Sequence, residues 1–572
     1  MVTLTIDNLT ATVEEGTTVL EAARSVGIDI PTLCYLKDLN EIGACRVCVV
    51  EIEGSDVLRA SCNTQACDGM VVHTHSRKVR EARKDIVRMI LSRHDCHCPT
   101  CPRSGNCELQ RLAHELNVDG MPCAKQVPAN RWDRSIPLIR EESKCIGCLR
   151  CVAVCDQVQN LRVWDLLGAG SRARVGLRTA ERIQDSDCSL CGQCITHCPV
   201  GALHERDDSE KAFRAIEDEK KVTVVQIAPA VRSAWAEQLG IPEELATQGR
   251  MVAAAKALGF DYVLDTNYSA DLTIMEEASE FLERFTHKEE YAWPMFTSCC
   301  PGWVRFVKSR YPEFVGNLSS AKSPQQMFGA VIKTYFAQKT GIDPADLCSV
   351  SIMPCTAKKY EAGVAVMDDA GTGRDVDMVL TTREFVRMIR EARINVEQLP
   401  EMEFDSPLGY GTGAGVIFGA TGGVMEAALR SAHFMLSGKN PEPDAFKVVR
   451  MEAGWRILSV DVAGVEVTVA VSSGLGNARQ LLEALKDGNV TCDFVEIMAC
   501  PGGCVGGGGQ PISCNEERAA TRSKKLYALD ASNHLRFSHE NPDVQQTYGE
   551  FFGKPMSEKA HHLLHTDQAA WN

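Results

Sequence analysis

Alternating apolar and polar positions define the first elements of the chain. Residues 2–6 and 10–13 alternate with a period of two, which predicts two β-strands, and residues 18–26 carry helical spacing. This order is typical of a β-grasp domain. Residues 76–91 form a basic helical pattern, for which we expect a solvated helix face; a docking patch for an acidic ferredoxin is the alternative.

A different pattern begins near residue 210, after a charged linker at 207–221. Short apolar runs there alternate with helical patterns, such as 270–285 and 382–392. The alternation predicts an α/β fold with functional residues after the carboxyl ends of parallel strands. The predicted strands are residues 222–227, 262–264, 350–353, 378–381, 465–471 and 494–498.

Length and charge narrow the class of protein. A chain of 572 residues is expected to form about three to five domains. Its net charge of −15 argues against nucleic acid as a partner. We recognise no signal peptide, twin-arginine motif or apolar run of transmembrane length, so we expect a cytoplasmic protein that does not enter a membrane.

Cysteine is the most informative residue type, with 26 copies. In a large chain with repeated C-x2-C spacing, this number indicates metal or iron-sulfur binding rather than disulfides. Six cysteines fall outside the motifs described below and are interpreted as small apolar residues or spare thiols. They are Cys67, Cys96, Cys123, Cys348, Cys492 and Cys514.

A doubled C-x2-C-x2-C-x3-C run gives the strongest generic signal. In two-cluster ferredoxins the fourth cysteine of each run binds the other 4Fe-4S cluster. The first run has Asp156 where proline is common, which affects only the turn, and a different metal is the alternative. The expected ligand sets are Cys145, Cys148, Cys151 and Cys198 for one cluster, and Cys188, Cys191, Cys194 and Cys155 for the other.

Further cysteines follow predicted strands in the C-terminal half. Cys299 and Cys300 stand in TSCCPGW, Cys355 in MPCTAKK, and Cys500 and Cys504 in MACPGGC. A parallel sheet could bring four of these thiols to one crevice, and four thiolates are the usual ligands of a cubane 4Fe-4S cluster. Neighbouring cysteines point in different directions, so one of the first pair can ligate while the other serves proton chemistry. The glycines at 506–509 indicate a close approach of backbone to a bulky ligand.

The motifs TSCCPGW, MPCTAKKYEA and MACPGGCVGGGGQP closely resemble those of the FeFe-hydrogenases. The resemblance runs from about residue 210 to 510 and implies reversible oxidation of H2 and reduction of protons. It implies that Cys300, Cys355, Cys500 and Cys504 hold the cubane of the H-cluster. By its place in the motif, Cys504 would also bridge to a di-iron centre that carries CO, cyanide and an azadithiolate.

The same resemblance assigns residues around that centre. Cys299 would pass protons to the bridging amine, with Glu277, Ser319 and Glu280 as the relay; two surface carboxylates on an amphipathic helix are the alternative, and Glu276 is expected to face water. Lys358 would offer an ammonium to a cyanide ligand. Ala230 replaces a serine seen in some relatives, so no hydrogen bond to cyanide is expected there. The lining residues would be Pro229, Ala230, Gln325, Met353, Phe418 and Met498.

The N-terminal cysteines also resemble this family and the large iron-sulfur subunit of respiratory complex I. The first set implies a 2Fe-2S cluster, with a zinc ribbon as the alternative. The second set, spaced H-x3-C-x2-C-x5-C, implies a 4Fe-4S cluster with one histidine ligand, for which Cys96 and His97 are rival ligands. The first set is Cys34, Cys45, Cys48 and Cys62, and the second is His94, Cys98, Cys101 and Cys107.

The expected architecture is multidomain, α+β and α/β. It comprises a 2Fe-2S β-grasp domain at 1–78, a 4Fe-4S domain with one histidine ligand at 79–125, a two-cluster ferredoxin domain at 126–209, a catalytic domain at 210–514, and a tail at 515–572 that resembles the fused small subunit. The tail is expected to wrap the catalytic domain and to carry His561, His562 and His565 on its surface at a helix end, with a metal site as the alternative for these histidines.

Two kinds of partner remain open. Ferredoxin is expected as the redox partner, and flavin- and NAD(P)-binding subunits of a bifurcating complex are the alternative. No G-x-G-x-x-G site opens a βαβ unit in this chain, so any nicotinamide would bind another chain. Maturation proteins would supply the di-iron centre. A hydrogen sensor or a carrier of iron-sulfur clusters is the non-catalytic alternative; carriers lack the complete pocket, and no room remains after residue 515 for the signalling domain of a sensor.

Overall fold

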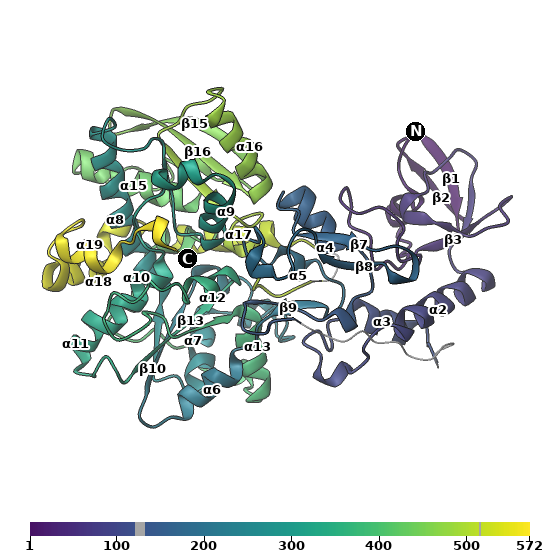
Figure 1. Ribbon diagram of the computed structural model, residues 1–572, viewed down its shortest axis with the longest axis horizontal. Helices are drawn as coiled ribbons and strands as arrows, with labels where there is room; N and C mark the ends of the chain where they lie inside the picture. Colours follow the sequence, from purple (N-terminus) through teal and green to yellow (C-terminus); the bar gives the residue numbers. More distant parts are fainter. Residues whose placement is uncertain (120–131, 514–515, 572) are drawn as a thin grey trace.

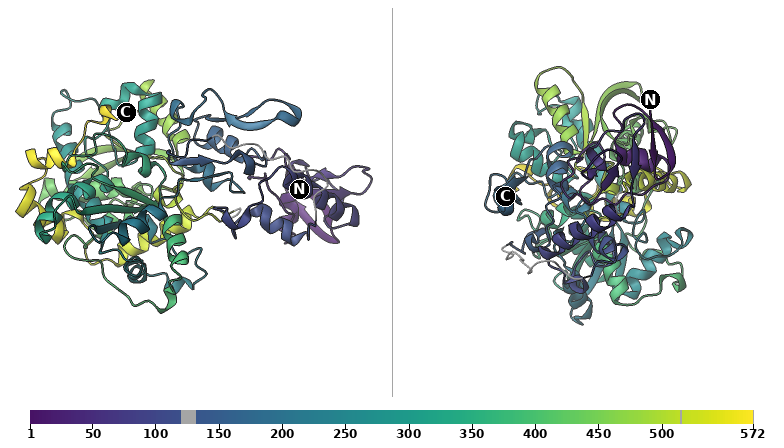
Figure 2. Two further views of the ribbon diagram at one scale, coloured as in Figure 1. Left: turned by 60° about the horizontal axis from the view of Figure 1, so that its bottom comes forward. Right: turned by 90° about the vertical axis from the view of Figure 1, so that its right-hand side faces the viewer.

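Small domains in the first third of the chain project from a larger C-terminal body (Figure 1, Figure 2). The computed structural model describes residues 1–119, 132–513 and 516–571. The predicted multidomain fold of α+β and α/β parts is confirmed. The predicted boundaries at 125/126 and 514/515 lie outside the described residues, as do Cys123 and Cys514.

The first domain is a five-stranded mixed sheet covered by one helix. The central pair, β1 and β5, is parallel, and the other pairs are antiparallel, in the order β2-β1-β5-β3-β4. The hydroxyl of Thr18 caps the helix by accepting a hydrogen bond from the backbone N–H of Glu21 at 3.3 Å. The elements are β1 (Val2–Ile6), β2 (Leu9–Val13), α1 (Val19–Ser25), β3 (Val49–Ile52), β4 (Arg59–Ala60) and β5 (Val71–His73).

Two helices, α2 (Arg77–Ser92) and α3 (Glu108–Glu115), follow this sheet. The basic pattern of α2 does not form a uniformly solvated face, because Arg83 is buried. Its guanidinium donates to the carbonyl oxygens of Val47 and Val49, at 3.2 and 2.8 Å. This arginine therefore ties α2 to the loop and strand that follow Cys45.

The ferredoxin domain contains two short antiparallel pairs and two short helices that repeat one conformation. Each helix begins after a residue with positive φ, Leu149 at 63° and Gly192 at 74°. The repeated C-x2-C spacing therefore gives two similar turns, as expected for a duplicated cluster loop. The elements are β6 (Leu138–Arg140) paired with β9 (Leu203–Glu205), β7 (Trp164–Leu167) paired with β8 (Arg174–Leu177), α4 (Arg150–Ala153) and α5 (Gln193–Thr196).

The catalytic region contains two four-stranded sheets, whereas the sequence suggested that one parallel sheet would gather the cysteines. The first sheet is parallel throughout, and the second is parallel except for its edge pair β15–β16. The first has the order β11 (Tyr262–Asp265), β10 (Val222–Ile227), β13 (Leu347–Met353), β14 (Met378–Thr381), and the second β12 (Met295–Phe296), β17 (Phe494–Met498), β16 (Val465–Ser473), β15 (Gly454–Val462).

Helices cover both sheets, and α8 (Thr266–Thr286) is the longest of them in the described residues. Most of its residues are buried on all sides, including three glutamates, so it is not a surface helix. The other helices are α6 (Ser209–Glu217), α7 (Gln248–Ala257), α9 (Pro301–Arg310), α10 (Pro324–Val331), α11 (Ala337–Thr340), α12 (Ala357–Glu361), α13 (Thr382–Glu391), α14 (Gly413–Ile417), α15 (Gly423–Ser437) and α16 (Leu475–Lys486).

The C-terminal tail packs along the catalytic region, with α17 near the ferredoxin side and α18 and α19 at the opposite end (Figure 1). Buried Asp271 of α8 anchors it by accepting hydrogen bonds from Ser538 at 2.7 Å and Asn541 at 2.8 Å. The tail therefore wraps the catalytic region as expected. Its helices are α17 (Ala519–Ser532), α18 (Pro542–Thr547) and α19 (Glu558–Leu564).

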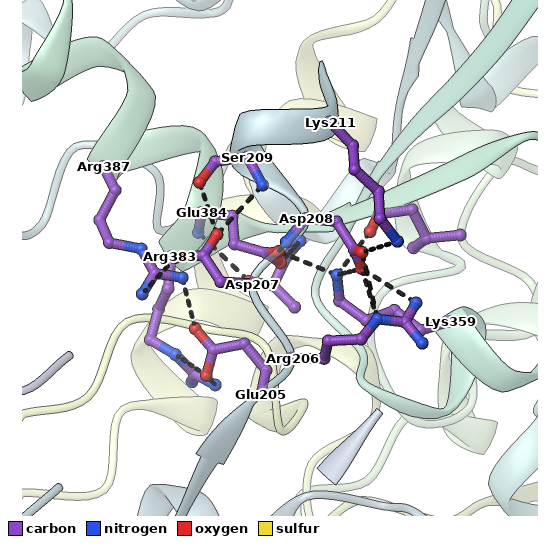
Figure 3. A network of polar contacts seen from close by, with 12 residues as sticks. Glu205, Arg206, Asp207, Asp208, Ser209, Lys211, Lys359, Arg383, Glu384 and Arg387 are labelled. Atoms are coloured by element: carbon purple, nitrogen blue, oxygen red, sulfur yellow. Dashed lines mark hydrogen bonds and ion pairs between the residues drawn. The ribbon is translucent and has the colours of Figure 1, made fainter. Parts of the chain in front are cut away.

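A buried ion network joins the ferredoxin domain to the catalytic region (Figure 3). Glu205 of β9 contacts Arg383 at 2.6 Å and Arg387 at 2.9 Å. Asp208 contacts Lys359 at 2.7 Å, and neither side chain is more than 2% exposed. The segment expected to be a charged linker is therefore part of a packed interface, and residues 209–217 within it form α6.

Among the residues that the structure describes, no helix is both long enough and apolar enough to cross a membrane.

Candidate functional site

Four thiols meet where strands of the two sheets end. Cys300 caps α9 just after β12, Cys355 lies two residues beyond β13, and Cys500 lies two residues beyond β17. Burial raises the pKa of the Cys355 thiol to about 12, and Cys300 adds to the effect. Burial likewise raises the pKa of Cys504, and Cys300 and Cys355 lie close enough to add to this rise. The thiols predicted to hold a cubane are therefore gathered in one place.

The glycine loop after Cys504 approaches the backbone of the chain's own loops. A Cβ atom on Gly507 would lie 2.1 Å from the carbonyl oxygen of Pro354, and one on Gly508 would lie 2.6 Å from the Cα atom of Gly192. The sequence suggested that these glycines make room for a ligand. In the structure, the lack of side chains at these glycines instead lets the loops that carry Cys355 and Cys191 pack closely against them.

A cavity of about 70 Å³ lies beside these thiols. Thiol, thioether and apolar side chains dominate its wall, and Lys358 contributes the cation. Every residue predicted to line the di-iron pocket contributes to this one cavity. They are Pro229, Ala230, Gln325, Met353, Phe418 and Met498, and Cys299, Cys300, Cys355 and Cys504 also contribute.

Glu361, which the sequence analysis did not single out, holds Lys358 in place. The Lys358 ammonium donates to the carbonyl oxygen of Cys299 at 3.0 Å and to the carboxylate of Glu361 at 3.0 and 3.1 Å. Burial alone would lower the pKa of Lys358, but the charge of Glu361 raises it above its usual value. The spacing of three residues on α12 was the available signal for this ion pair.

Among the proposed proton-relay residues, Cys299 lines the cavity and Glu277 lies close enough to interact with its thiol. Burial raises the pKa of the Cys299 thiol, and the charge of Glu277 adds to it. Burial, followed by the charge of Glu280, raises the pKa of Glu277 to about 8. Contacts with the backbone of Ser298 and the side chain of Ser319 oppose this rise but do not offset it. A buried carboxyl that stays protonated near neutral pH suits proton transfer.

The outer part of this relay is directly connected. The Ser319 hydroxyl donates to Glu280 at 2.6 Å, and Arg284 donates to the same carboxylate at 2.6 Å. Both glutamates are buried on α8, so they are not the surface pair of an amphipathic helix. Glu276 was expected to face water, but it is fully buried, because Tyr548, Met556 and His565 of the tail surround its carboxylate.

The cysteines of the doubled repeat group as the crossover rule predicts. The charged neighbours of Cys151 are Cys148, Cys198 and Cys145, so the last cysteine of the second run lies with the first run. Cys194 in turn interacts most strongly with Cys191, Cys188 and Cys155, and less with Cys151 of the other set, so the last cysteine of the first run lies with the second. The arrangement offers two sets of four thiols, which is the donor number of a 4Fe-4S cluster.

The N-terminal thiols are also gathered. The Cys34 thiol interacts with Cys45 and Cys62, and Cys48 interacts with Cys62, which brings the four predicted ligands into one group. The exposed Cys67 thiol instead points to the carbonyl oxygen of Gln65 at 3.8 Å.

The three thiols of the predicted histidine-containing set are only partly buried, whereas each of the other sets includes at least one buried thiol. Cys98 interacts with the rival Cys96 and then with Cys101, Cys107 also interacts with Cys101, and His94 is buried just after the end of α2. The rival Cys96 thiol donates to the carbonyl oxygen of His94 at 3.3 Å. The other rival, His97, is exposed and contacts Asp95.

Comparison with family models agrees with these groups. Residues 221–508 match the C-terminal domain of the iron only hydrogenase large subunit. Residues 1–77 match a 2Fe-2S iron-sulfur cluster binding domain, and residues 83–122 match the iron-sulfur binding region of NADH-ubiquinone oxidoreductase-G. Residues 144–202 match a 4Fe-4S dicluster domain, and residues 516–568 match the iron hydrogenase small subunit.

Two individual proteins are similar over nearly the whole chain, and a solved structure is similar over part of it. The NADP-reducing hydrogenase subunit HndD of Solidesulfovibrio fructosivorans is 45% identical, over 99% of this chain and 98% of that one. Iron hydrogenase 1 of Clostridium pasteurianum is 38% identical, over 99% of both chains. A solved FeFe-hydrogenase from Chlamydomonas reinhardtii is 40% identical with a TM-score of 0.55, and the match covers 63% of this chain and 98% of that one. The chain therefore belongs to the FeFe-hydrogenase family, as its motifs predicted.

Proposed function

We propose that the cavity beside Cys299 is where this chain converts H2 reversibly into two protons and two electrons. The main support for this proposal is that one cavity is lined by Cys299, Lys358, three of the four central thiols and all the expected lining residues. Side chains alone cannot carry out this reaction, so a metal centre is required.

The donor set fits the expected cofactor. Cys300, Cys355, Cys500 and Cys504 would hold the cubane of the H-cluster, and Cys504 would bridge to the di-iron centre with its CO, cyanide and azadithiolate ligands. When bound, this group supplies an open low-valent metal site and a basic amine. Four thiols without disulfide partners and an ammonium fixed at the cavity wall match those requirements.

The remaining residues would tune the site and move protons. Lys358 supplies a fixed positive charge, and the apolar side chains of Met353, Phe418 and Met498 keep the cavity dry, which strengthens electrostatic interactions. Cys299 would exchange protons with Glu277, and Ser319 and Glu280 would carry them onward. Ala230 has no side-chain donor to offer.

The accessory thiol groups would carry the electrons. We propose one 2Fe-2S cluster in the N-terminal domain, a 4Fe-4S cluster bound by His94, Cys98, Cys101 and Cys107, and two 4Fe-4S clusters in the doubled repeat. The burial of His94 and the outward position of His97 support this choice of histidine. An imidazole ligand removes one negative charge and raises the cluster's potential.

The electron partner is the second part of the proposal. Ferredoxin is one candidate, and flavin- and NAD(P)-binding subunits are the other. The identity of 45% to a subunit of an NADP-reducing hydrogenase, over nearly the full length of both chains, favours the second. Dependence on maturation proteins and a cytoplasmic location complete the proposal, since the many thiols of this chain suit a reducing compartment.

Infrared spectroscopy of the protein matured with its di-iron centre tests the central point. We expect stretching bands of CO and cyanide together with H2 turnover. Absence of these bands after successful maturation of a reference hydrogenase in parallel would contradict the di-iron assignment. Pull-down from the native host, followed by assay of NADP or ferredoxin reduction, separates the two partners.

A further inference from the structure

The buried carboxylate of Glu276 is linked to the proton relay through the C-terminal tail. His565 lies between the two: its Nε2 atom is 3.1 Å from Glu276, and its Nδ1 atom is 2.8 Å from the Ser320 hydroxyl. That hydroxyl lies 3.0 Å from Glu280, the outermost carboxylate of the relay. The side chains of Glu280, Ser320, His565 and Glu276 therefore form one continuous row of hydrogen bonds.

The row can move a proton without moving a heavy atom. In one arrangement, Ser320 donates to Glu280, and a cationic His565 donates to Ser320 from Nδ1 and to Glu276 from Nε2. In the other, the Nδ1 proton has passed to the Ser320 oxygen and the serine proton has passed to Glu280. One proton leaves the imidazole and one arrives on the carboxylate, so the charges balance.

An exposed histidine lies beside the outer part of the row. His561, one turn earlier on α19, is exposed, and its ring stacks on that of His565 with centroids 5.0 Å apart and planes at 4°. The Tyr548 hydroxyl also donates to Glu276. Among the described residues, the charged or titratable groups beside this row include Arg284 and Glu277 next to Glu280, Tyr548 next to Glu276, and His561 next to His565.

We propose that His565 and Glu276 form a second branch of the proton route, which runs from Glu280 to solvent through the C-terminal tail. The inference rests on the proposed function of the cavity and deepens it. Arg284 marks the first branch, and the two branches part at the Glu280 carboxylate. His565 acts through Glu280 and touches no cofactor, so it is a positioning and proton-carrying residue.

The tail does not depend on the imidazole to stay in place. The backbone N–H of Lys322 donates to Leu564 at 2.8 Å, and that of Thr566 donates to Ser320 at 2.8 Å. These bonds flank His565 on both sides and survive a change of its side chain. A variant at this position therefore removes the proton carrier while the neighbouring backbone stays docked.

The test compares His565→Gln with the matured parent protein and with His562→Gln, which changes an exposed histidine of α19, the helix that ends just before His565. Glutamine can form hydrogen bonds there, but unlike an imidazole its side chain does not take up and release a proton in water. We expect His565→Gln to keep the CO and cyanide bands and to lose turnover on the order of ten-fold, with a larger solvent isotope effect. The control should match the parent in all three measurements.

A second variant, His565→Ala, guards against loss of folding. Free imidazole should restore its turnover in a saturable manner, because a mobile base can then occupy the space. Parent-like turnover, isotope effect and pH profile in His565→Gln, with its bands intact, would overturn the branch and leave His565 a structural contact. If imidazole fails to rescue His565→Ala while the bands remain, the branch is also overturned. A parent protein without the bands contradicts the proposed function instead.

Discussion

The Sγ atom of Cys500 lies 3.8 Å from the backbone carbonyl oxygen of Cys191. The first residue belongs to the central thiol group and the second to the ferredoxin repeat, so the two proposed cluster sites meet through a direct contact. Thr356 reinforces it by donating to the carbonyl oxygen of Leu190 at 2.7 Å. We infer that electrons enter the catalytic region at this point.

Gly192→Ala should disturb this contact. A Cβ atom there would lie 2.6 Å from the Thr356 hydroxyl and 2.8 Å from the Cα atom of Gly508. We expect the infrared bands to persist while turnover with an electron donor that enters through the accessory clusters slows. Gly240→Ala is the matched control, because Gly240 has the same φ of +74° but open space around it, and both changes carry about 1–2 kcal/mol of backbone strain. Equal turnover in both variants would argue against this entry point.

Cys299→Ser should separate assembly of the site from proton transfer. A serine hydroxyl retains the size of the side chain but releases its proton far less readily, so turnover should fall by about 10²–10⁴-fold. The CO and cyanide bands should remain, since Cys299 is not among the proposed ligands. Turnover equal to that of the parent would remove Cys299 from the proton route.

Glu277 should titrate near pH 8, because burial and Glu280 raise its pKa to about 8. It is therefore protonated at neutral pH and loses its proton as the pH rises through that value. Because the pKa in the native state exceeds that of the unfolded chain, the contribution of this proton to stability declines as pH rises from about 4.5 to about 8. The protonated-carboxyl band in difference infrared spectra should fall to half near pH 8 and disappear above it.

Glu277→Gln identifies the band, since buried Glu496 has a pKa raised by burial to about 7 and would contribute a second signal. The component that titrates near pH 8 should be absent from the variant. A difference spectrum in which that component survives the substitution would show that another carboxyl is responsible.

Glu361→Ala should destabilise the cavity wall. The Lys358 ammonium would then stay buried with the Cys299 carbonyl oxygen as its remaining hydrogen-bond partner among the described residues, and breaking a buried ion pair costs on the order of 3–5 kcal/mol. We expect a lower unfolding temperature and weaker infrared bands per iron. Glu313→Ala, which breaks an exposed pair with Lys486, is the control and should change little. Equal effects of the two substitutions would contradict the role of Glu361.

Glu205→Ala should loosen the interface between the ferredoxin domain and the catalytic region. Burial opposes ionisation of this carboxyl, but Arg383 and Arg387 hold its pKa well below the usual value. Its contribution to stability is therefore present above the ordinary pKa of a glutamate and is lost as the pH falls. Limited proteolysis near residues 207–221 should become faster in the variant at neutral pH, and the difference from the parent should shrink in acid. A rate that matches the parent at every pH would show that other contacts hold the interface.

The sequence predicted those features that depend on short-range patterns of residues, such as the bounds of single strands. Strands β10, β14 and β17 have the predicted bounds, and the central cysteines follow strands as expected. The pairing of strands depends on contacts that no local pattern encodes, so the division into two sheets was missed. Strand β15 was missed as well, although it forms a long antiparallel pair with β16.

The residues of the site were predicted from motifs. The wrong predictions concern residues that are buried by parts of the chain far away in the sequence. Glu276 resembles any exposed helical carboxylate, yet Tyr548 and His565 cover it from 272 and 289 residues further along the chain. His565 was read with its exposed neighbours, and Asp208 was assigned to a linker for the same reason. Only the folded tail and the packed interface reveal the surroundings of these groups.

The two turns of the ferredoxin repeat share a backbone shape, with Leu149 where the other has Gly192. The half with leucine would not fit against the hydrogenase body, because its side chain would occupy the space of Thr356 and Gly508. The two halves of the ferredoxin domain are therefore not interchangeable. The four carbon atoms of the leucine side chain decide which half can face the catalytic region.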